Sequence, residues 1–476
     1  MNHEEPHAAA VKTLLRQIFK CSLAVLPACM LAPHATAQQN IATLTPNQQA
    51  TARNLADVCQ RLGAMAGGGA EGPATDLTAD QLDLLTRCAS VFSEAGVSQA
   101  AIDELGAQQF NAIRTVSVQF AQNQYQSVMD RLVALRSGQR RTPLAKVKRA
   151  TGEDALARMD QPLGNQPLGG GASSDGAEPG DLLANRAGFW MRGTYGDGGK
   201  HSSIADAGFR SDQWGATSGF DYRFGKEMVA GVSLGYGESN ISFRPGGQGG
   251  FDADALNVSA YGTVYAGGFY ADGIFNYIDT DYDTSRRILY AESPGSLLDR
   301  NARASINGRT LTAGLSIGYD LVLGAFTLAP VIGYFYVDGD LDGFREQGAG
   351  GVDLLYDDRD FRSSTGNIGL RASFAWRTPI GVFIPQLRAA YIREFDDDME
   401  TFRVRFANDP LNAMPPSTPI VINGGSVDQS YFKFALGVSA QFKYDISGYV
   451  EYQRLQSFRF VDFGDLTFGL RMQRGF

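Results

Sequence analysis

Two segments of the chain match the G-x-S-x-G pattern of serine hydrolases, Gly231–Gly235 and Gly314–Gly318. In a hydrolase this pattern holds the nucleophilic serine on a strained turn between a strand and a helix. Here Ser233 and Ser316 each lie in the middle of a run in which small and apolar residues alternate. That alternation predicts a strand with a row of small side chains on one face, so we expect neither serine to act as a nucleophile.

The chain has four histidines, and His3, His7 and His34 lie in a predicted signal peptide. Only His201 would remain in the mature chain, which leaves no Ser-His-Asp triad and no zinc site. Acidic clusters in 353–360 and 396–400 could bind a divalent cation weakly, although solvated loops explain them better. We therefore expect no enzymatic activity, no catalytic residue, no metal site and no cofactor. The net charge of −9 also gives no reason to expect nucleic acid as a partner.

Residues 1–37 have the pattern of a secretory signal peptide. Basic residues Lys12, Arg16 and Lys20 precede the apolar run 21–32, and an A-x-A site ends at Ala37. Cleavage is expected between Ala37 and Gln38, and the run is shorter than the roughly 20 residues of a membrane-spanning helix. An alternative takes 26–29 as a lipoprotein box with Cys29 lipidated, which Pro27 fits poorly.

Residues 38–137 are predicted to form three helices. The first starts at Thr45-Pro46, and the second starts at a capping box made by Thr78 and Gln81. The third runs from about Gln99 to Ser137. Cys59 and Cys88 are the cysteines left after cleavage of the signal peptide, and an even pair in an exported chain favours a disulfide over two buried thiols.

Residues 138–185 are predicted to form a linker rich in Gly and Pro. A basic run comes first, formed by Arg140, Arg141, Lys146, Lys148 and Arg149. We interpret it as solvated, with contact to lipid head groups as the alternative. The following stretch, 163–181, is rich in Gly, Pro, Ser and Asn, which is typical of a flexible tether.

Residues 186–476 alternate between apolar and polar positions and predict twelve antiparallel strands. Their expected bounds are 187–196, 211–224, 227–243, 252–266, 268–285, 303–323, 325–338, 360–377, 380–396, 427–444, 447–458 and 463–476. The small and polar face includes charges, among them Lys433 and Lys443, which suit a water-filled lumen better than a dry core. The pattern predicts an all-β, twelve-stranded transmembrane barrel preceded by a small α-helical region.

Short and long connections alternate between these strands. The short ones fall at 225–226, 267, 324, 378–379 and 445–446, and the long ones at 197–210, 244–251, 286–302, 339–359 and 397–426. Outer-membrane barrels keep short turns in the periplasm and long loops outside, so both ends of the barrel should face the periplasm. Eight polar or charged residues are predicted to face the lumen, where they could contact a plugging helix or be solvated: Asp221, Arg223, Asp272, Asn276, Arg371, Arg388, Glu451 and Arg471.

The barrel region resembles the translocator barrel of the autotransporter (type V secretion) family. The likeness is carried by GFWMRGTY at 188–195, GFDYRFG at 219–225, VAGVSLGYGES at 229–239 and the final Phe476. The resemblance implies insertion by the barrel-assembly machinery, with Phe468, Leu470, Met472 and Phe476 as the assembly signal, and a helix threaded through the pore. Arg474 departs from the family's apolar pattern in this last strand.

The sequence therefore predicts a protein of the Gram-negative outer membrane that anchors, and could translocate, its own short helical segment. The threading helix would come from 116–136 or from 151–160. Two alternatives stay open: a channel with a periplasmic plug, and a surface adhesin that binds through its long loops. We expect outer-membrane lipid, the general secretion machinery and the barrel-assembly machinery as partners, and a monomeric protein.

Overall fold

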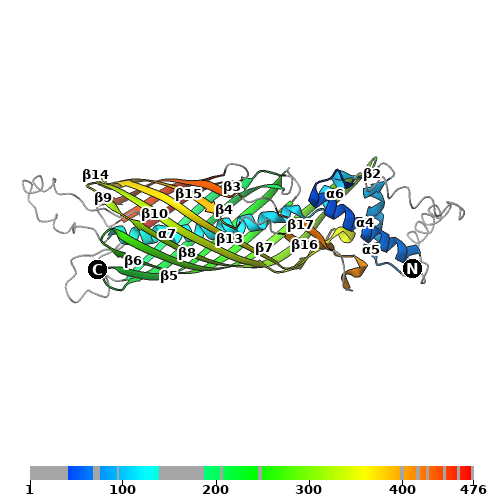
Figure 1. Cartoon of the computed structure of the whole chain (residues 1–476), viewed down its shortest axis with the longest axis horizontal. Helices are drawn as coiled ribbons and strands as arrows, with labels where there is room; N and C mark the ends of the chain where they lie inside the picture. Colours follow the sequence, from blue (N-terminus) through cyan, green and yellow to red (C-terminus); the bar gives the residue numbers. More distant parts are fainter. Residues whose placement is uncertain are drawn as a thin grey trace, which may run out of the picture.

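The computed structural model describes residues 41–67, 76–93, 96–138, 187–203, 207–244, 249–396, 401–413, 419–424, 428–442, 446–457 and 461–472. The molecule is elongated, with a barrel of strands at one end and a group of helices at the other (Figure 1). The predicted signal peptide with its cleavage site, the linker beyond residue 138 and Phe476 lie outside the described residues.

The barrel is one closed antiparallel sheet, and the predicted count of twelve strands is confirmed. The strands are β3 (Ala187–Lys200), β4 (Gly208–Arg223), β5 (Met228–Arg244), β6 (Gly249–Ala266), β7 (Phe269–Ser293), β8 (Ser296–Tyr319), β10 (Phe326–Leu341), β13 (Arg359–Phe374), β15 (Gly381–Glu394), β18 (Ser430–Phe442), β19 (Ile446–Ser457) and β20 (Val461–Met472). Two short segments, β9 (Leu321–Leu323) and β14 (Trp376–Thr378), continue β8 and β13 after single-residue breaks. The sheet closes where β20 pairs with β3, so no barrel edge is left unpaired.

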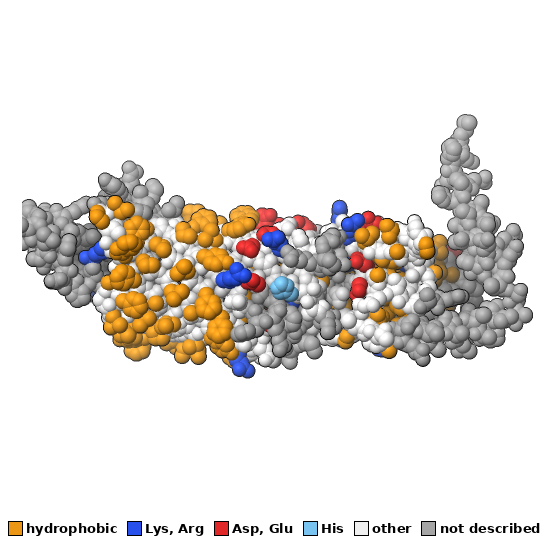
Figure 2. Space-filling model, turned by 90° about the horizontal axis from the view of Figure 1, so that it is seen from above, with side chains coloured by type: hydrophobic (Ala, Val, Ile, Leu, Met, Phe, Trp, Pro, Cys, Tyr) orange, Lys and Arg blue, Asp and Glu red, His pale blue; other side chains and the backbone are white. Residues whose placement is uncertain are grey.

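The two faces of the barrel wall differ as the alternation predicts. In β8, Leu315 and Ile317 are exposed, whereas Thr312 and Ser316 are buried in the lumen. Figure 2 shows hydrophobic side chains covering the half of the barrel far from the helices, with charged side chains beyond this belt. An apolar outer belt around a polar interior is the arrangement that lipid requires. Among the described residues, no helix combines the length and the apolar character needed to cross a membrane.

Tight turns join the strands at the end of the barrel that carries the apolar belt. Gly225, Gly267 and Gly324 occupy three of these turns with φ of 112°, 62° and 64°. Glycine is favoured there because side chains with a Cβ rarely adopt positive φ. We call this the short-turn end of the barrel.

The predicted loop 286–302 is wrong, because strands occupy almost all of it. β7 runs to Ser293 and β8 starts at Ser296, so only two residues form the turn between them. The extended hairpin, which we call the β7–β8 arm, buries Ile288, Tyr290 and Leu298. A strand of 25 residues spans roughly 80 Å, far more than the 9–11 residues that cross a bilayer.

Two further long connections, 339–359 and 397–426, form a small sheet of their own. Its strands are β11 (Phe344–Arg345), β12 (Leu354–Tyr356), β16 (Thr401–Phe406) and β17 (Ile420–Asn423), in that order. Short 3-10 turns at Gly350–Val352 and Pro410–Ala413 flank them. We call this the loop sheet. Its buried face includes Leu354, Val404 and Ile422.

The helical region consists of α4 (Pro46–Gly67), α5 (Ala79–Val91) and α6 (Gln99–Leu105), with a two-residue hairpin, β1 (Phe92–Ser93) and β2 (Gly96–Val97), before α6. We call the described residues from 41 to 110 the helical cap. The capping box of Thr78 and Gln81 is confirmed. The predicted disulfide between Cys59 and Cys88 is also confirmed. It joins α4 to α5, and the Cα atoms of the two cysteines are 5.8 Å apart.

The prediction of one helix from Gln99 to Ser137 is wrong in one respect. α6 ends at Leu105, and after the turn at Gln108–Phe110 a new helix, α7 (Asn111–Gly138), begins. Gly106 has extended backbone angles, and its N–H donates to the carbonyls of Ile102 and Asp103. This break lets the chain leave the cap and enter the barrel as α7, which lies inside the lumen (Figure 1).

Candidate functional site: the helix in the barrel and the docked cap

Small residues on the lumen face let α7 lie directly against strands β4 to β8. A Cβ placed on Gly237 would lie 2.2 Å from the ring of Phe120, and one on Gly314 would lie 2.1 Å from the ring of Tyr125. A Cβ on Gly235 would lie 2.7 Å from the side-chain oxygen of Gln124. Both G-x-S-x-G segments therefore belong to barrel strands, and glycines in them make room for the helix.

Buried ion pairs join the last third of α7 to the wall of the barrel. Arg131 donates two hydrogen bonds to the carboxylate of Asp221, at 2.7 and 3.1 Å. Asp130 accepts from Arg388 at 2.7 Å and also from Arg192. A buried charge that loses its partner is costly, so these pairs specify how far α7 enters the lumen and which way it is turned.

Arg136 continues this series of contacts toward the short-turn end. Its guanidinium pairs with Asp272 of β7, and both side chains are almost fully buried. The guanidinium carbon also lies 3.8 Å from the centre of the Tyr270 ring, within the range of a cation–π contact.

An apolar cluster surrounds the first half of α7, at the end of the lumen near the cap. Val116 and Phe120 of α7 belong to one buried cluster with Phe243, Phe251 and Tyr282 of the wall. The hydroxyls of Ser117 and Tyr282 are hydrogen-bonded at 2.7 Å. We call these residues the collar. The same cluster continues without interruption into the core of the cap and the loop sheet.

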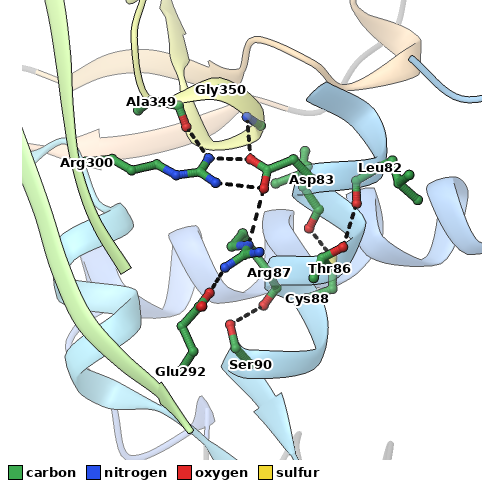
Figure 3. A network of polar contacts seen from close by, with 12 residues as sticks. Leu82, Asp83, Thr86, Arg87, Cys88, Ser90, Glu292, Arg300, Ala349 and Gly350 are labelled. Carbon is green, nitrogen blue, oxygen red and sulfur yellow. Dashed lines mark hydrogen bonds and ion pairs between the residues drawn. The ribbon is translucent and has the colours of Figure 1, made fainter. Parts of the chain in front are cut away.

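The cap is docked on the β7–β8 arm by a group of polar contacts centred on Asp83 of α5 (Figure 3). Arg300 of the arm donates to Asp83 with both terminal nitrogens, one of them at 2.8 Å, and the backbone N–H of Gly351 donates at 2.9 Å. Burial alone would raise the pKa of Asp83, but the hydrogen bonds from Arg300 and Gly351 outweigh it and lower the pKa below 3.8. Arg87 of α5 forms a second ion pair with the arm, to the carboxylate of Glu292.

Further contacts join the cap to the loop sheet. Arg61 of α4 binds the carboxylate of Asp409 through two nitrogens, at 2.7 and 3.3 Å. The amide side chain of Asn47 donates to the carbonyl of Asn423 at 3.0 Å and accepts from its N–H at 2.9 Å. The two hydrogen bonds between Asn47 and Asn423 are of the kind that a neighbouring strand would form at the edge of the loop sheet.

Arg286 connects the arm, the loop sheet and the cap at one buried point. Its guanidinium pairs with Glu346 and donates to the carbonyl of Val352 at 3.1 Å. It also donates to the carbonyl of Glu104 in α6, at 3.0 Å. The guanidinium of Arg286 therefore contacts two segments that lie far from β7 in the sequence, and it links them to the arm.

The predicted lumen residues have different partners. Asp221 and Arg388 contact α7 directly, and Glu451 accepts from Arg388 at 2.5 Å. Arg371 instead pairs with Asp320 of the wall at 3.1 Å, and Arg223 donates to the Tyr265 hydroxyl at 3.1 Å. The side chain of Arg471 lies outside what the structure describes.

The last described strand places one residue of the expected assembly signal. Phe468 points outward and is 51% exposed, in line with a lipid-facing position. The side chains of Leu470 and Met472 are not among those described.

Sequence reasoning missed the helix side of the site, namely Asp130, Arg131 and Arg136, together with Arg192 of β3. A signal for the first three was present. The whole stretch 111–138 has only four charged residues, and three of them lie between 130 and 136. Charges grouped on one segment of an otherwise uncharged helix indicate fixed partners of opposite charge.

The described part of the chain contains no arrangement that suggests catalysis. Ser233 and Ser316 face the lumen, where Ser316 donates to Asp272 at 3.2 Å, whereas His201 is exposed. Within these same residues no group of three or more His, Cys, Asp or Glu side chains is placed to hold a metal ion.

A family model described as "Autotransporter beta-domain" matches residues 189–453, more than half of the chain. The chain belongs to the autotransporter family. It is accordingly a protein of the Gram-negative outer membrane, and autotransporters reach that membrane through secretion and barrel-assembly machinery.

Curated relatives resemble this autotransporter mainly over its barrel. It is 25% identical to Esterase EstA of Pseudomonas aeruginosa over 271 residues, which are 55% of this chain and 39% of the relative. It is 23% identical to Outer membrane protein A of Rickettsia conorii over 292 residues, which are 60% of this chain and 14% of the relative. The chain thus spans about two fifths or less of these relatives.

Solved structures of autotransporter barrels also resemble this one. The translocator domain of NalP from Neisseria meningitidis has a TM-score of 0.45 and 18% identity, over 60% of this chain and 88% of that one. The beta domain of the Bordetella autotransporter BrkA has a TM-score of 0.42 and 18% identity, over 61% of this chain and 100% of that one.

Proposed function

We propose that this autotransporter exports its own helical cap and keeps it docked on the outer end of the barrel. The observation that carries the proposal is the position of the cap, which contacts the β7–β8 arm and the loop sheet and lies far from the short turns. Short turns of outer-membrane barrels face the periplasm, so the cap lies on the cell surface.

The direction of α7 supports this orientation. The helix leaves the cap at Asn111 and ends at Gly138, and Arg136 near its end contacts Asp272 close to the short turns. β3 begins at the same end of the barrel, where Ala187 pairs with Tyr222 beside the turn at Gly225. A plug held in the periplasm would instead require the cap beside Gly225 and Gly267.

The exported cap is retained rather than released. Its contacts with the barrel include the pairs of Asp83 with Arg300 and of Arg61 with Asp409, and its apolar core is continuous with the collar. A released passenger would need a surface that is complete without the barrel. The cap therefore acts as a small, permanently displayed surface module.

The function is not enzymatic. Some relatives carry the names esterase and lipase, but the resemblance to them covers only 39% and 35% of their lengths. The mature chain retains a single histidine, His201, in the barrel domain and none in the cap. The protein is monomeric, is delivered by the general secretion machinery after cleavage before Gln38, and is inserted by the barrel-assembly machinery, with Phe468, Leu470, Met472 and Phe476 as its signal.

Surface labelling of intact cells tests the orientation. Arg53 is exposed on α4, and Lys226 is exposed in a short turn, so each can be replaced by cysteine while the disulfide protects the native pair. A membrane-impermeant maleimide should label Arg53→Cys on intact cells and Lys226→Cys only after the outer membrane is permeabilised. The reverse pattern would place the cap in the periplasm and refute the proposal.

A further inference from the structure

α7 does not fill the lumen evenly. It packs against β4 to β8 and leaves a cavity of about 120 Å³ on the opposite side, next to β10, β13, β15 and β18. The apolar part of the lining includes Val331, Phe335 and Ile392, and the polar part includes Asn367, Arg388 and Lys433. This combination of a mostly apolar wall with a few polar groups is typical of small-molecule sites.

Of the polar groups just named, Lys433 carries a positive charge that no described carboxylate contacts. Arg388 is bound to Asp130 and Glu451, and Arg371 on the same wall is bound to Asp320. Among the described residues no carboxylate lies within 4.0 Å of the Lys433 ammonium, whose side chain lines the cavity. An ammonium held in such surroundings is stabilised by an anion placed against it.

A second cavity adjoins this one on the side of the short-turn end. Arg136 and Tyr270 line both this cavity and a second one of about 200 Å³, whose other walls include Lys226, Gly267 and Asp320. At the opposite end of the lumen the collar packs around Phe120. The two cavities are therefore neighbours, and the second one lies on the side of the short turns.

We propose that the cavity binds a small organic monocarboxylate with a compact apolar body. The carboxylate accepts hydrogen bonds from Lys433 and lies beside Arg388, and the apolar body packs on Val331 and Ile392. An apolar cavity of about 150 Å³ accepts benzene, so the volume here suits one ring or a short alkyl chain. This site does not depend on export of the cap, since it requires only α7 in the lumen.

Titration calorimetry of the purified full-length protein in detergent, with benzoate as the probe, tests the site. Benzoate should bind saturably, and benzyl alcohol, which lacks the charge, should bind at least about tenfold more weakly. Lys433→Met should weaken benzoate binding about tenfold or more, Lys433→Arg should retain it, and the control Lys200→Met should leave it unchanged. If Lys433→Met does not assemble, Val331→Trp, which fills the cavity, should abolish binding instead.

Absence of saturable benzoate binding would overturn the proposal. Equal binding of benzyl alcohol and benzoate would also overturn it. The same holds if benzoate binding survives in every assembled variant of Lys433 and Val331. Correct assembly of each variant is judged from the shift in gel mobility that a folded barrel shows before and after heating.

Discussion

Arg131 of α7 and Asp221 of β4 form a two-point ion pair inside the barrel, with both side chains 4% exposed. The pair joins a segment that enters the barrel from the cap to the first hairpin of the wall. Because an arginine fork and a carboxylate match in only one relative geometry, the pair specifies both the depth and the rotation of the helix.

Arg131→Met should lower the free energy of unfolding of the barrel by about 3 kcal/mol, because Asp221 is then buried without a partner. The double variant Arg131→Met/Asp221→Leu should recover most of that loss, since neither charge remains. Thermal unfolding followed by the change in gel mobility measures both. The control Arg53→Met, on the exposed face of α4, should have no effect, and a single variant as stable as the wild type would contradict the role of the pair.

Gly237→Leu should displace α7 and open the pore, because a side chain there collides with the ring of Phe120. Conductance in planar bilayers should rise several-fold over that of the wild type. Gly273→Leu is the matched control. Its Cβ would meet no atom closer than 3.7 Å, so its conductance should stay at the wild-type level. Equal conductance of the two variants would argue against close packing of the helix in the lumen.

The docking of the cap on the arm should weaken in acid through Asp83. The pKa of this carboxyl is lower in the folded protein than its ordinary value of 3.8, so its contribution is complete above that value and is lost as the pH falls through the folded pKa. Limited proteolysis of the cap should therefore become faster below about pH 4. Asp83→Asn should be cut faster at neutral pH and should lose this part of the pH dependence. A pH profile identical to that of the wild type would exclude Asp83 as the responsible group.

The disulfide between Cys59 and Cys88 should stabilise the cap and not the barrel. It closes a loop across 29 positions, which corresponds to about 3.6 kcal/mol by the chain-entropy relation. Cys59→Ser/Cys88→Ser should make the cap more susceptible to protease while the heat-induced mobility shift of the barrel stays unchanged. A matching loss of barrel stability would show that the two parts unfold as one unit.

Much of this architecture could be predicted from alternation alone. Strands such as β8 face lipid with Leu315 and Ile317 and face the lumen with Ser316, and a period of two is sufficient to show it. The helical starts at Pro46 and Thr78 were also visible, because they depend on local capping.

The docking contacts could not be predicted, since they join segments distant in sequence. Arg286, Glu346 and Glu104 meet only after the loops have folded over the arm. The sequence from 286 to 302 looks like a charged loop because the inner face of the arm is covered by the cap rather than by the barrel. A pattern within one strand contains no information about such a partner.

The position of α7 inside the barrel is the central claim, and cross-linking in intact outer membranes tests it most directly. Gln124 approaches the lumen-facing Gly235, whereas the neighbouring Leu234 is 59% exposed on the outer surface. With a short bifunctional thiol reagent, the pair Gln124→Cys/Gly235→Cys should cross-link within one chain, and Gln124→Cys/Leu234→Cys should not. Equal cross-linking of the two pairs, or none in the first, would contradict a helix in the lumen.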